Sequence, residues 1–472
     1  MTISFQRLSK AFVFLSLAYV IINLFIIAFM DRSASFRLAA DGGSWFIPAQ
    51  SLLHSGSLSS PDYPGLEIYR SPGVAVFFAG LMYLAGGESV SAIVAGQICA
   101  LYVTAVLFRA TVKDWFPRYA DLGMALILFN PSLLAMAYFT QSETLATLTA
   151  MIALFFLLRY TKGKTSWPVV LALGLSLGVT CLIRTNPIYL VYLLPVVLPI
   201  VGLIEQHDVS WRLAVAKGTL ATCVAVAVMV PWAINVYEMT GHIGLSILIS
   251  PRAEYEYVYD QLTILEAAHS NISTHDAKIA LDQGTREAFV QSFGTRWNGL
   301  SETERFVLLK DHTLKSMLGY PLRDWTTALG LSMAQFYFGG GAGAWHNLFG
   351  TFAGGMVQSF SETPKADVLA FLRSVILKAP LGALALSAMC FAFIAVVRTA
   401  LIFGFVELCR RRLWGLLLIL SGTSLYFGLS TLFQGQARYR ASIEPELMLM
   451  AVAGFALIWE GLRKSRSQAV PH

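Results

Sequence analysis

Charged residues are scarce in this sequence, and their scarcity excludes most classes of soluble protein. Asp, Glu, Lys and Arg make up only 13% of the 472 residues, whereas 56% of the residues are hydrophobic. The mean hydropathy is +0.62, and a typical soluble domain has roughly 25% charged residues. The composition therefore predicts a polytopic membrane protein.

Cysteine patterns typical of metal sites or disulfide frameworks are also missing. There is no CxxC pair and no Cys/His spacing of the kind that holds a metal. The five cysteines stand singly in or at the ends of apolar segments, and we interpret them as small buried hydrophobic residues: Cys99, Cys181, Cys223, Cys390 and Cys409. No low-complexity segment and no convincing nucleotide-binding glycine loop is present. The net charge of +6 does not indicate a nucleic-acid partner, because Lys and Arg lie beside apolar spans, where they orient a membrane chain.

Apolar runs of roughly 17 to 25 residues predict about ten transmembrane helices. The first run, 11–30, follows Arg7 and Lys10. It is too long for a signal-peptide core, and no small-residue cleavage site follows it. The other predicted spans are 88–108, 120–140, 143–159, 167–183, 188–204, 213–233, 381–398, 413–431 and 442–462.

Basic clusters recur on alternate sides of these spans, and this recurrence predicts the cytoplasmic face. The clusters are Arg7/Lys10, Arg109/Lys113/Arg118, Arg159/Lys162/Lys164, Arg212/Lys217, Arg410/Arg411/Arg412 and Arg463/Lys464/Arg466. The outer face then holds the loops 31–87, 140–143, 184–187, 234–378 and 432–441. A crossing by 73–86 would invert every later cluster, so an apolar hairpin or helix on the outer surface is expected there.

These boundaries predict three parts in an all-α membrane protein. Residues 1–233 form an N-terminal transmembrane module, whose outer loop 31–87 carries interfacial helices. Residues 234–378 form a mainly helical outer-face domain, and residues 379–472 form C-terminal transmembrane helices.

Two segments of the outer-face domain have recognisable patterns. Ser301-Glu302-Thr303-Glu304 is a capping box that opens a helix with Phe306, Leu309, Thr313 and Met317 along one side. The segment 325–338 is apolar enough to lie in the interface or to dip into the bilayer.

The first outer loop contains an acid and a base at the predicted membrane surface. Asp41 precedes a short helix, 45–54, that stops at Gly56, and Arg70-Ser71-Pro72-Gly73 forms a later turn. Either Asp41 or Ser44 caps this helix, or Asp41 takes a proton from an acceptor hydroxyl. Asp62 and Glu67 are further candidate bases.

Glu143 and four arginines are the other candidate site residues on the outer face. Glu143 lies at an outer turn, where it is solvated, binds a metal, or contacts an acceptor or Asp41. Arg70, Arg184, Arg438 and Arg440 depart from the charge bias of the chain. They either reach toward lipid headgroups or stabilise a phosphate leaving group.

The order of these residues resembles the GT-C superfamily of membrane glycosyltransferases, in the branch of protein O-mannosyltransferases and lipid A aminoarabinose transferases. The pattern A-D-x-x-x-W followed by Y-R-S-P-G is similar to the family's first outer loop, with Trp45 where Tyr is most usual. Further matches are Asn130-Pro131, Ser142-Glu143, the run 174–184, Pro231-Trp232 with Asn235 and Gly241, and Arg438-Tyr439-Arg440 before Pro445. The chain departs from the family pattern at Ile234, where the family usually has an Arg that contacts phosphate.

The resemblance implies a polyprenyl-phosphate sugar as donor and a glycolipid such as lipopolysaccharide, or a protein, as acceptor. It implies a bacterial inner-membrane location, a periplasmic active site and inversion at the anomeric carbon. The implied site residues are Asp41 as base, Glu143 as second acid, Arg70, Arg184, Arg438 and Arg440 as contacts of the donor phosphate, and Trp45, Tyr69 and Tyr439 as substrate contacts. Because no second carboxylate adjoins Asp41, a reaction without metal or other cofactor is expected.

Two other classes of protein remain open, a lipid or glycan transporter (flippase) and a structural subunit of an envelope assembly. The ionisable residues gather at outer loops rather than along a path at the membrane midplane, and no inverted repeat is evident. The enzyme is therefore favoured, with its acceptor contacts expected in the least matched region, 242–378.

Overall fold

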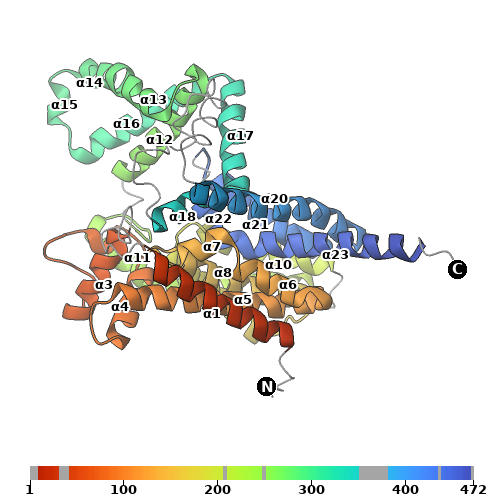
Figure 1. Cartoon of the computed structure of the whole chain (residues 1–472). Helices are drawn as coiled ribbons and strands as arrows, with labels where there is room; N and C mark the ends of the chain where they lie inside the picture. Colours follow the sequence, from red (N-terminus) through yellow and green to blue (C-terminus); the bar gives the residue numbers. More distant parts are fainter. Residues whose placement is uncertain are drawn as a thin grey trace.

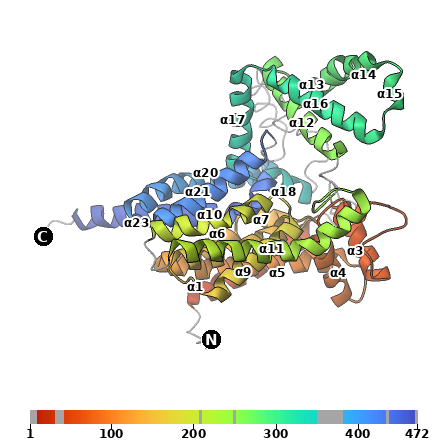
Figure 2. The same cartoon turned by 180° about the vertical axis from the view of Figure 1, so that it is seen from behind.

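The computed structural model describes residues 9–30, 42–205, 210–246, 251–349, 381–433 and 437–468. Within these ranges all regular secondary structure is helical, and no strand occurs. Long apolar helices lie side by side in one body, and a smaller helical lobe stands on it (Figures 1 and 2). The predicted class, an all-α polytopic membrane protein, is confirmed.

The N-terminal part contributes most helices of the body. These are α1 (Lys10–Phe29), α3 (Gly43–Ser55), η1 (Leu66–Ile68), α4 (Gly73–Leu84), α5 (Val90–Trp115), η2 (Pro117–Tyr119), α6 (Ala120–Leu128), α7 (Pro131–Met136), α8 (Glu143–Thr161), α9 (Trp167–Ile183), α10 (Ile188–Ile204) and α11 (Trp211–Thr240). The C-terminal part adds α20 (Leu381–Arg410), α21 (Trp414–Ser430), α22 (Ala437–Arg440), η6 (Ala441–Ile443) and α23 (Glu444–Gln468).

Six helices of the described residues are long and apolar enough to cross a membrane. They are α1, α5, α8, α11, α20 and the continuous run Arg438–Arg463, which includes most of α23. Helices α9, α10 and α21 coincide with predicted spans, but each has only 17 residues. The predicted total of about ten crossings is therefore not confirmed.

The predicted span 120–140 is wrong as a single helix. The chain breaks at Asn130, whose side-chain oxygen accepts hydrogen bonds from the backbone N–H groups of Ser132 (2.9 Å) and Leu133 (3.3 Å). Pro131 then occupies the first position of α7 and has no N–H to continue the ladder of α6. This break turns the chain before it enters α8 at Glu143.

The first outer loop forms two short helices. Helix α3 begins with Gly42 as its N-cap, without a side-chain capping bond, so the expectation of Ser44 as N-cap is wrong. Asp41, the other expected cap, lies outside the described residues. Helix α4 is continuous over 12 residues, about 18 Å at 1.5 Å per residue, so the hairpin alternative for 73–86 is also wrong.

Small residues allow two helix pairs of the body to approach closely. A Cβ at Gly404 of α20 would lie 1.8 Å from the Met450 carbonyl oxygen of α23, and one at Gly454 would lie 1.7 Å from that of Ala400. In α9, a Cβ at Gly178 would meet the Ala225 carbonyl oxygen of α11 at 2.8 Å. Such contacts through small residues are typical of membrane helices, because close backbones gain van der Waals packing.

The cysteines are only partly as expected. Cys181 and Cys390 are buried, but Cys99 and Cys223 are exposed on the outsides of α5 and α11. The expectation that all five are buried is wrong, because apolar side chains of a membrane helix can face lipid as well as protein. All five are free thiols.

Several ends of the helices that carry basic clusters meet at one end of the body. Lys162, at the end of α8, donates to the Asp114 carbonyl oxygen of α5. Arg411, directly after α20, pairs with Glu460 of α23 at 3.0 Å, and its guanidinium lies over the Phe116 ring. The arrangement agrees with the expected sharing of one face by these clusters.

The lobe contains a short bundle of helices (Figure 1). It consists of α12 (Pro251–Ser270), α13 (Thr274–Leu281), η4 (Asp282–Arg286), α14 (Glu287–Phe293), α15 (Arg296–Gly299) and α16 (Glu302–Leu318). The predicted capping box at Ser301 and Glu304 is confirmed, with Leu309, Thr313 and Met317 buried on the inner side of α16.

Helix α17 (Leu322–Phe338) connects the lobe to the body and runs across the direction of the long helices in both views (Figures 1 and 2). Its first half packs in the lobe, where Trp325 meets Phe433. Its second half enters the body, where Phe336 packs against Phe427. The short helix α18 (Ala342–Leu348) follows it.

Candidate active site

A polar cavity of about 210 Å³ lies where the first outer loop, the start of α8, the end of α9 and the chain before α23 meet. It is lined by six of the candidate residues, Trp45, Arg70, Glu143, Arg184, Arg438 and Tyr439, together with Ser71, Ser142, Ile183, Thr185, Asn186 and Ser246. Three guanidinium groups thus face a single carboxylate, so the described lining is net positive. Such a cavity favours an anion with several oxygen atoms.

Arg70 enters the cavity from the turn between η1 and α4. Its guanidinium carbon lies 5.1 Å from the centre of the Trp45 ring and 5.1 Å from that of Tyr69. Trp45 reaches this position because it lies in the first turn of α3, and its side chain is buried. Aromatic faces hold the charge in place at about 0.5–2 kcal/mol per contact.

Glu143 and Arg184 form the wall opposite the first outer loop. Arg184 is the C-cap of α9, and its Nη1 lies 3.6 Å from Oε1 of Glu143, the first residue of α8. Both side chains are largely buried, since Arg184 is 11% exposed and Glu143 is 4% exposed. Among the described residues, Oε2 of Glu143 has no hydrogen-bond partner. A buried carboxylate oxygen normally has one, so a ligand group that donates a hydrogen bond fits this position.

Arg438 and Tyr439 close the cavity from the C-terminal side. Nη2 of Arg438 lies 3.2 Å from the Tyr439 hydroxyl oxygen, and the Tyr439 ring has two guanidinium carbons near its face, those of Arg438 at 5.1 Å and Arg184 at 5.4 Å. The three side chains therefore form one cationic and aromatic wall.

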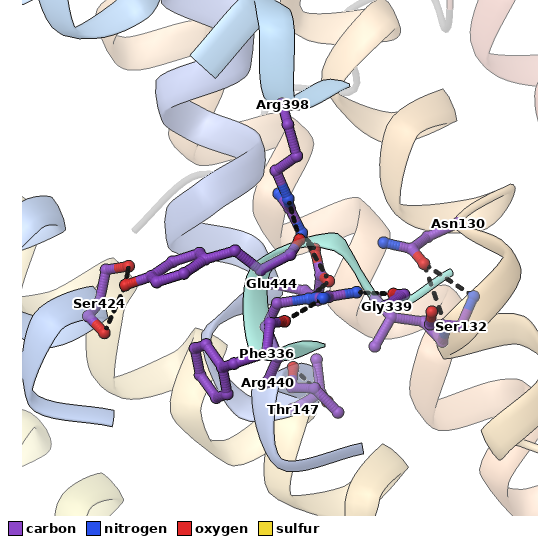
Figure 3. Close-up of polar contacts among 12 residues, drawn as sticks. Asn130, Ser132, Thr147, Phe336, Gly339, Arg398, Ser424, Arg440 and Glu444 are labelled. Carbon is purple, nitrogen blue, oxygen red and sulfur yellow. Dashed lines mark hydrogen bonds and ion pairs between the residues drawn. The ribbon is translucent and has the colours of Figure 1, made fainter. Parts of the chain in front are cut away.

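Arg440 is not a cavity residue. Its side chain is fully buried, pairs with Glu444 and donates to the backbone oxygens of Phe336 and Gly339 (Figure 3). In a helical turn successive side chains point about 100° apart, so Arg440 points inward where Arg438 and Tyr439 point to the cavity. The structure therefore gives no support to Arg440 as a contact of the donor phosphate.

The remaining candidates lie near the cavity or outside the described part of the chain. Tyr69 is beside Arg70 but is not part of the lining. Asp62 is exposed, and Glu67 is buried away from the lining. Asp41 is not described, but it lies four residues before Trp45, which lines the cavity.

The Pro-Trp element at 231–241 has a different place from the one its resemblance suggests. Ile234, at the position of the missing Arg, is exposed on α11 and does not line the cavity. Trp232 instead donates its ring N–H to the Leu245 carbonyl oxygen at 3.0 Å. It therefore supports the chain beside Ser246, which does line the cavity.

Sequence reasoning missed the small polar residues of the lining. Ser71 and Ser142 lie inside the motifs that identified Arg70 and Glu143, and Thr185 and Asn186 directly follow Arg184. The position of these four residues next to Arg70, Glu143 and Arg184 in the sequence was the only signal that could have identified them. Ser246 belongs to no motif. The neighbouring Leu245, which accepts the hydrogen bond from Trp232 and packs against Cys181 and Met229, brings this segment to the cavity.

An apolar groove of about 270 Å³ lies next to the polar cavity. Helices α8, α9, α10, α21 and α23 line it, mainly with Leu, Ala, Val and Ile side chains. Thr180 and Pro187 line the groove. Residues 183–186, which lie between them in the chain, line the cavity. A polar head in the cavity could thus continue as an apolar chain in the groove.

No group of three or more His, Cys, Asp or Glu side chains that could hold a metal occurs in the described ranges. Asp41 lies outside those ranges, so the expected metal independence stays a prediction.

The helical body and the cationic cavity define a polytopic membrane protein, and comparison with known proteins shows which family part of the chain resembles. Residues 69–235 match the model of the dolichyl-phosphate-mannose-protein mannosyltransferase family. The matched range includes Arg70, Glu143 and Arg184. The expected resemblance to the GT-C superfamily of membrane glycosyltransferases is thereby confirmed.

A search of curated proteins found no match. Among solved structures, the chain is similar to the archaeal oligosaccharyltransferase AglB from Archaeoglobus fulgidus, in complex with an inhibitory peptide and a dolichol-phosphate. The sequence identity is 10% and the TM-score is 0.48, over 97% of this chain and 52% of that chain. The chain thus spans about half the length of that protein.

Proposed function

We propose that this protein is a glycosyltransferase that moves a monosaccharide from a polyprenyl-phosphate donor to an envelope acceptor. The observation that carries the proposal is the cavity with three arginines and one buried glutamate, directly beside an apolar groove. The match to a family of dolichyl-phosphate-mannose-protein mannosyltransferases supports the same donor class.

In this mechanism the donor phosphate binds in the polar cavity and its polyprenyl chain in the groove. Arg70, Arg184 and Arg438 surround the phosphate and stabilise the negative charge that grows as the bond to the anomeric carbon breaks. Arginine suits this role because its planar group donates two parallel hydrogen bonds to phosphate. Trp45 and Tyr439 provide apolar and aromatic surface for the sugar.

The acceptor hydroxyl attacks the anomeric carbon from the face opposite the phosphate, which inverts the configuration. Asp41 is the proposed base, by its place in the family's first outer loop and its position four residues before Trp45. Glu143 is the second acid. Its Oε2 has no hydrogen-bond partner among the described residues and can accept a hydrogen bond from the acceptor or the sugar. Positioning and electrostatics supply most of the acceleration.

The proposed location is the bacterial inner membrane, with the cavity on the periplasmic side. The cavity lies at the ends of α8 and α9 opposite to Arg159 and Lys162, which belong to the predicted cytoplasmic clusters. A lipopolysaccharide, another glycolipid or a protein at that surface is the proposed acceptor.

Mass spectrometry of envelope glycolipids and glycoproteins, from cells with and without the protein, tests the proposal. We expect one monosaccharide to be lost from one fraction of the deletion strain and restored by the wild-type gene. Unchanged masses in both fractions would overturn the proposal, and movement of lipid without a covalent product would replace it with a transporter.

The same assay tests the proposed base. Asp41→Asn should leave the amount of membrane protein unchanged and abolish sugar transfer, because the amide cannot accept the proton of the acceptor hydroxyl. Near wild-type transfer by this variant would remove Asp41 from the mechanism but not the glycosyltransferase itself.

A further inference from the structure

Three buried charged side chains form a cluster at the C-terminal end of α17 (Figure 3), and one of them, Arg440, directly follows the cavity residues Arg438 and Tyr439. Glu444, the first residue of α23, pairs with Arg440 and with Arg398 of α20, whose Nη2 lies 3.1 Å from Oε1. Arg440 and Glu444 are fully buried and Arg398 is 4% exposed. The proposed reaction does not use any of these groups.

The cluster holds one carboxylate between two guanidinium groups, so it has an excess positive charge in the protein interior. This charge faces the C-terminal end of α17. Arg440 donates to the carbonyl oxygens of Phe336 and Gly339, and Arg398 donates through Nε to that of Tyr337 at 2.8 Å. The last carbonyls of a helix have no intrahelical partner and carry about half a negative charge, which the two arginines satisfy.

Arg440 belongs to the same short helix as Arg438 and Tyr439, two residues of the cavity wall. Since α22 is a single turn, fixing the Arg440 side chain also fixes the rotation of this turn about its axis. Thr147 of α8 secures the next residue, because its hydroxyl lies 2.9 Å from the Ala441 carbonyl oxygen and 2.8 Å from that of Glu143. The cluster and Thr147 therefore join both walls of the cavity to one support.

We infer that Arg398, Glu444 and Arg440 are positioning residues that hold Arg438 and Tyr439 toward the donor phosphate by fixing their turn to the C-terminal end of α17. The inference rests on the proposed function for the identity of the ligand. It gives α17 a second role beyond joining the lobe to the body, since a shift of this helix moves the carbonyls to which Arg440 is bound.

The test measures binding of farnesyl phosphate to the full-length protein in detergent, for wild type, Arg440→Lys, Arg438→Ala and the double variant. Lysine keeps the charge of Arg440 but cannot reach Glu444 and two carbonyls together. We expect Arg440→Lys and Arg438→Ala each to weaken binding about tenfold, and the double variant to be no weaker than Arg438→Ala alone. Arg286→Lys, on an exposed side chain of the lobe, is the matched control.

The outcomes separate the inference from the proposed function. If wild type does not bind farnesyl phosphate, the proposed function fails. If wild type binds but Arg440→Lys binds equally well, or the two losses multiply in the double variant, the positioning role is overturned. Thermal unfolding shows whether Arg440→Lys is folded. If it is not, Arg398→Lys, which keeps the pair of Arg440 with Glu444, takes its place in the same double-mutant cycle. Binding of farnesyl phosphate by Arg398→Lys equal to that of wild type would also overturn the positioning role.

Discussion

At the scale of single residues, the four outer-face arginines divide into two groups by what surrounds them. Arg70, Arg184 and Arg438 lie against aromatic rings in a cavity, whereas Arg440 is enclosed by Glu444 and the end of α17. All four lie on the predicted outer face, against the charge bias of the chain, and this position identified them as candidates. The division could not be predicted, because it depends on Phe336 and Gly339, a hundred residues away in the chain.

A substitution of Arg70 tests whether the planar shape of its guanidinium, and not only its charge, is needed to contact phosphate. Arg70→Lys keeps the positive charge but loses the planar group that lies near the Trp45 and Tyr69 rings. We expect the KM for the lipid-linked sugar to rise about tenfold, because lysine cannot make two parallel hydrogen bonds. Initial rates of sugar transfer in liposomes measure it.

Arg212→Lys, an exposed substitution at the start of α11, is the control and should leave KM unchanged. An unchanged KM in Arg70→Lys, with thermal unfolding like that of wild type, would contradict a contact between Arg70 and phosphate.

At the scale of elements, the groove between α10 and α21 predicts how chain length affects binding. Gly422 lines the groove, and a Cβ built on it meets no atom within 4 Å, so Gly422→Leu projects into empty space. We expect weaker binding of a long polyprenyl phosphate and unchanged binding of inorganic phosphate, measured by competition with a labelled lipid. A Leu side chain occupies the place of apolar lipid atoms.

Gly382→Leu is the matched control, because Gly382 is also a helical glycine with open space around it but lies on α20 outside the groove. Equal affinity of both variants for the long lipid would show that its chain does not occupy the groove.

Helices α14 and α16 of the lobe predict a loss of stability in acid. The His312 ring stacks on Phe289 with centroids 4.0 Å apart. Burial lowers the pKa of His312 from 6.5, and the charge of Lys315 lowers that pKa further. The unfolded chain therefore takes up a proton at a higher pH than the folded lobe, so stability is full above pH 6.5 and falls as the pH drops toward the lowered pKa.

Hydrogen exchange of residues 287–318 in neutral and mildly acidic buffer measures this effect. We expect the protection factors, which correct the observed exchange for its intrinsic rate at each pH, to fall in acid for wild type and to change little with pH for His312→Gln. His275→Gln, at an exposed position, should behave like wild type. The same acid response in His312→Gln would assign the effect to other groups.

At the scale of the whole molecule, the sequence predicted features that depend on composition and local order. The membrane class follows from hydropathy, α9 and α10 from apolar runs, and α16 from its capping box. The break at Asn130 follows from local signals that the prediction of one span over 120–140 did not use, the Asn130 cap and Pro131. The position of α17 across the long helices follows from tertiary contacts. The meeting of residues 45, 70, 143, 184 and 438 in one cavity was suggested by shared sidedness and by family order, but their distances were not.

The proposed placement of the lobe and of the basic helix ends on opposite sides of the membrane gives the last prediction. In a variant whose five cysteines are replaced by serine, Thr295→Cys adds a thiol at an exposed position of the lobe, and Lys164→Cys adds one between α8 and α9. A membrane-impermeant maleimide should label the first in intact spheroplasts and the second only after permeabilisation, because Lys and Arg clusters favour the cytoplasmic side. Labelling of the Lys164→Cys variant in intact spheroplasts would place the basic ends outside. The cavity, at the opposite ends of α8 and α9, would then face the cytoplasm, and a periplasmic acceptor could not reach it.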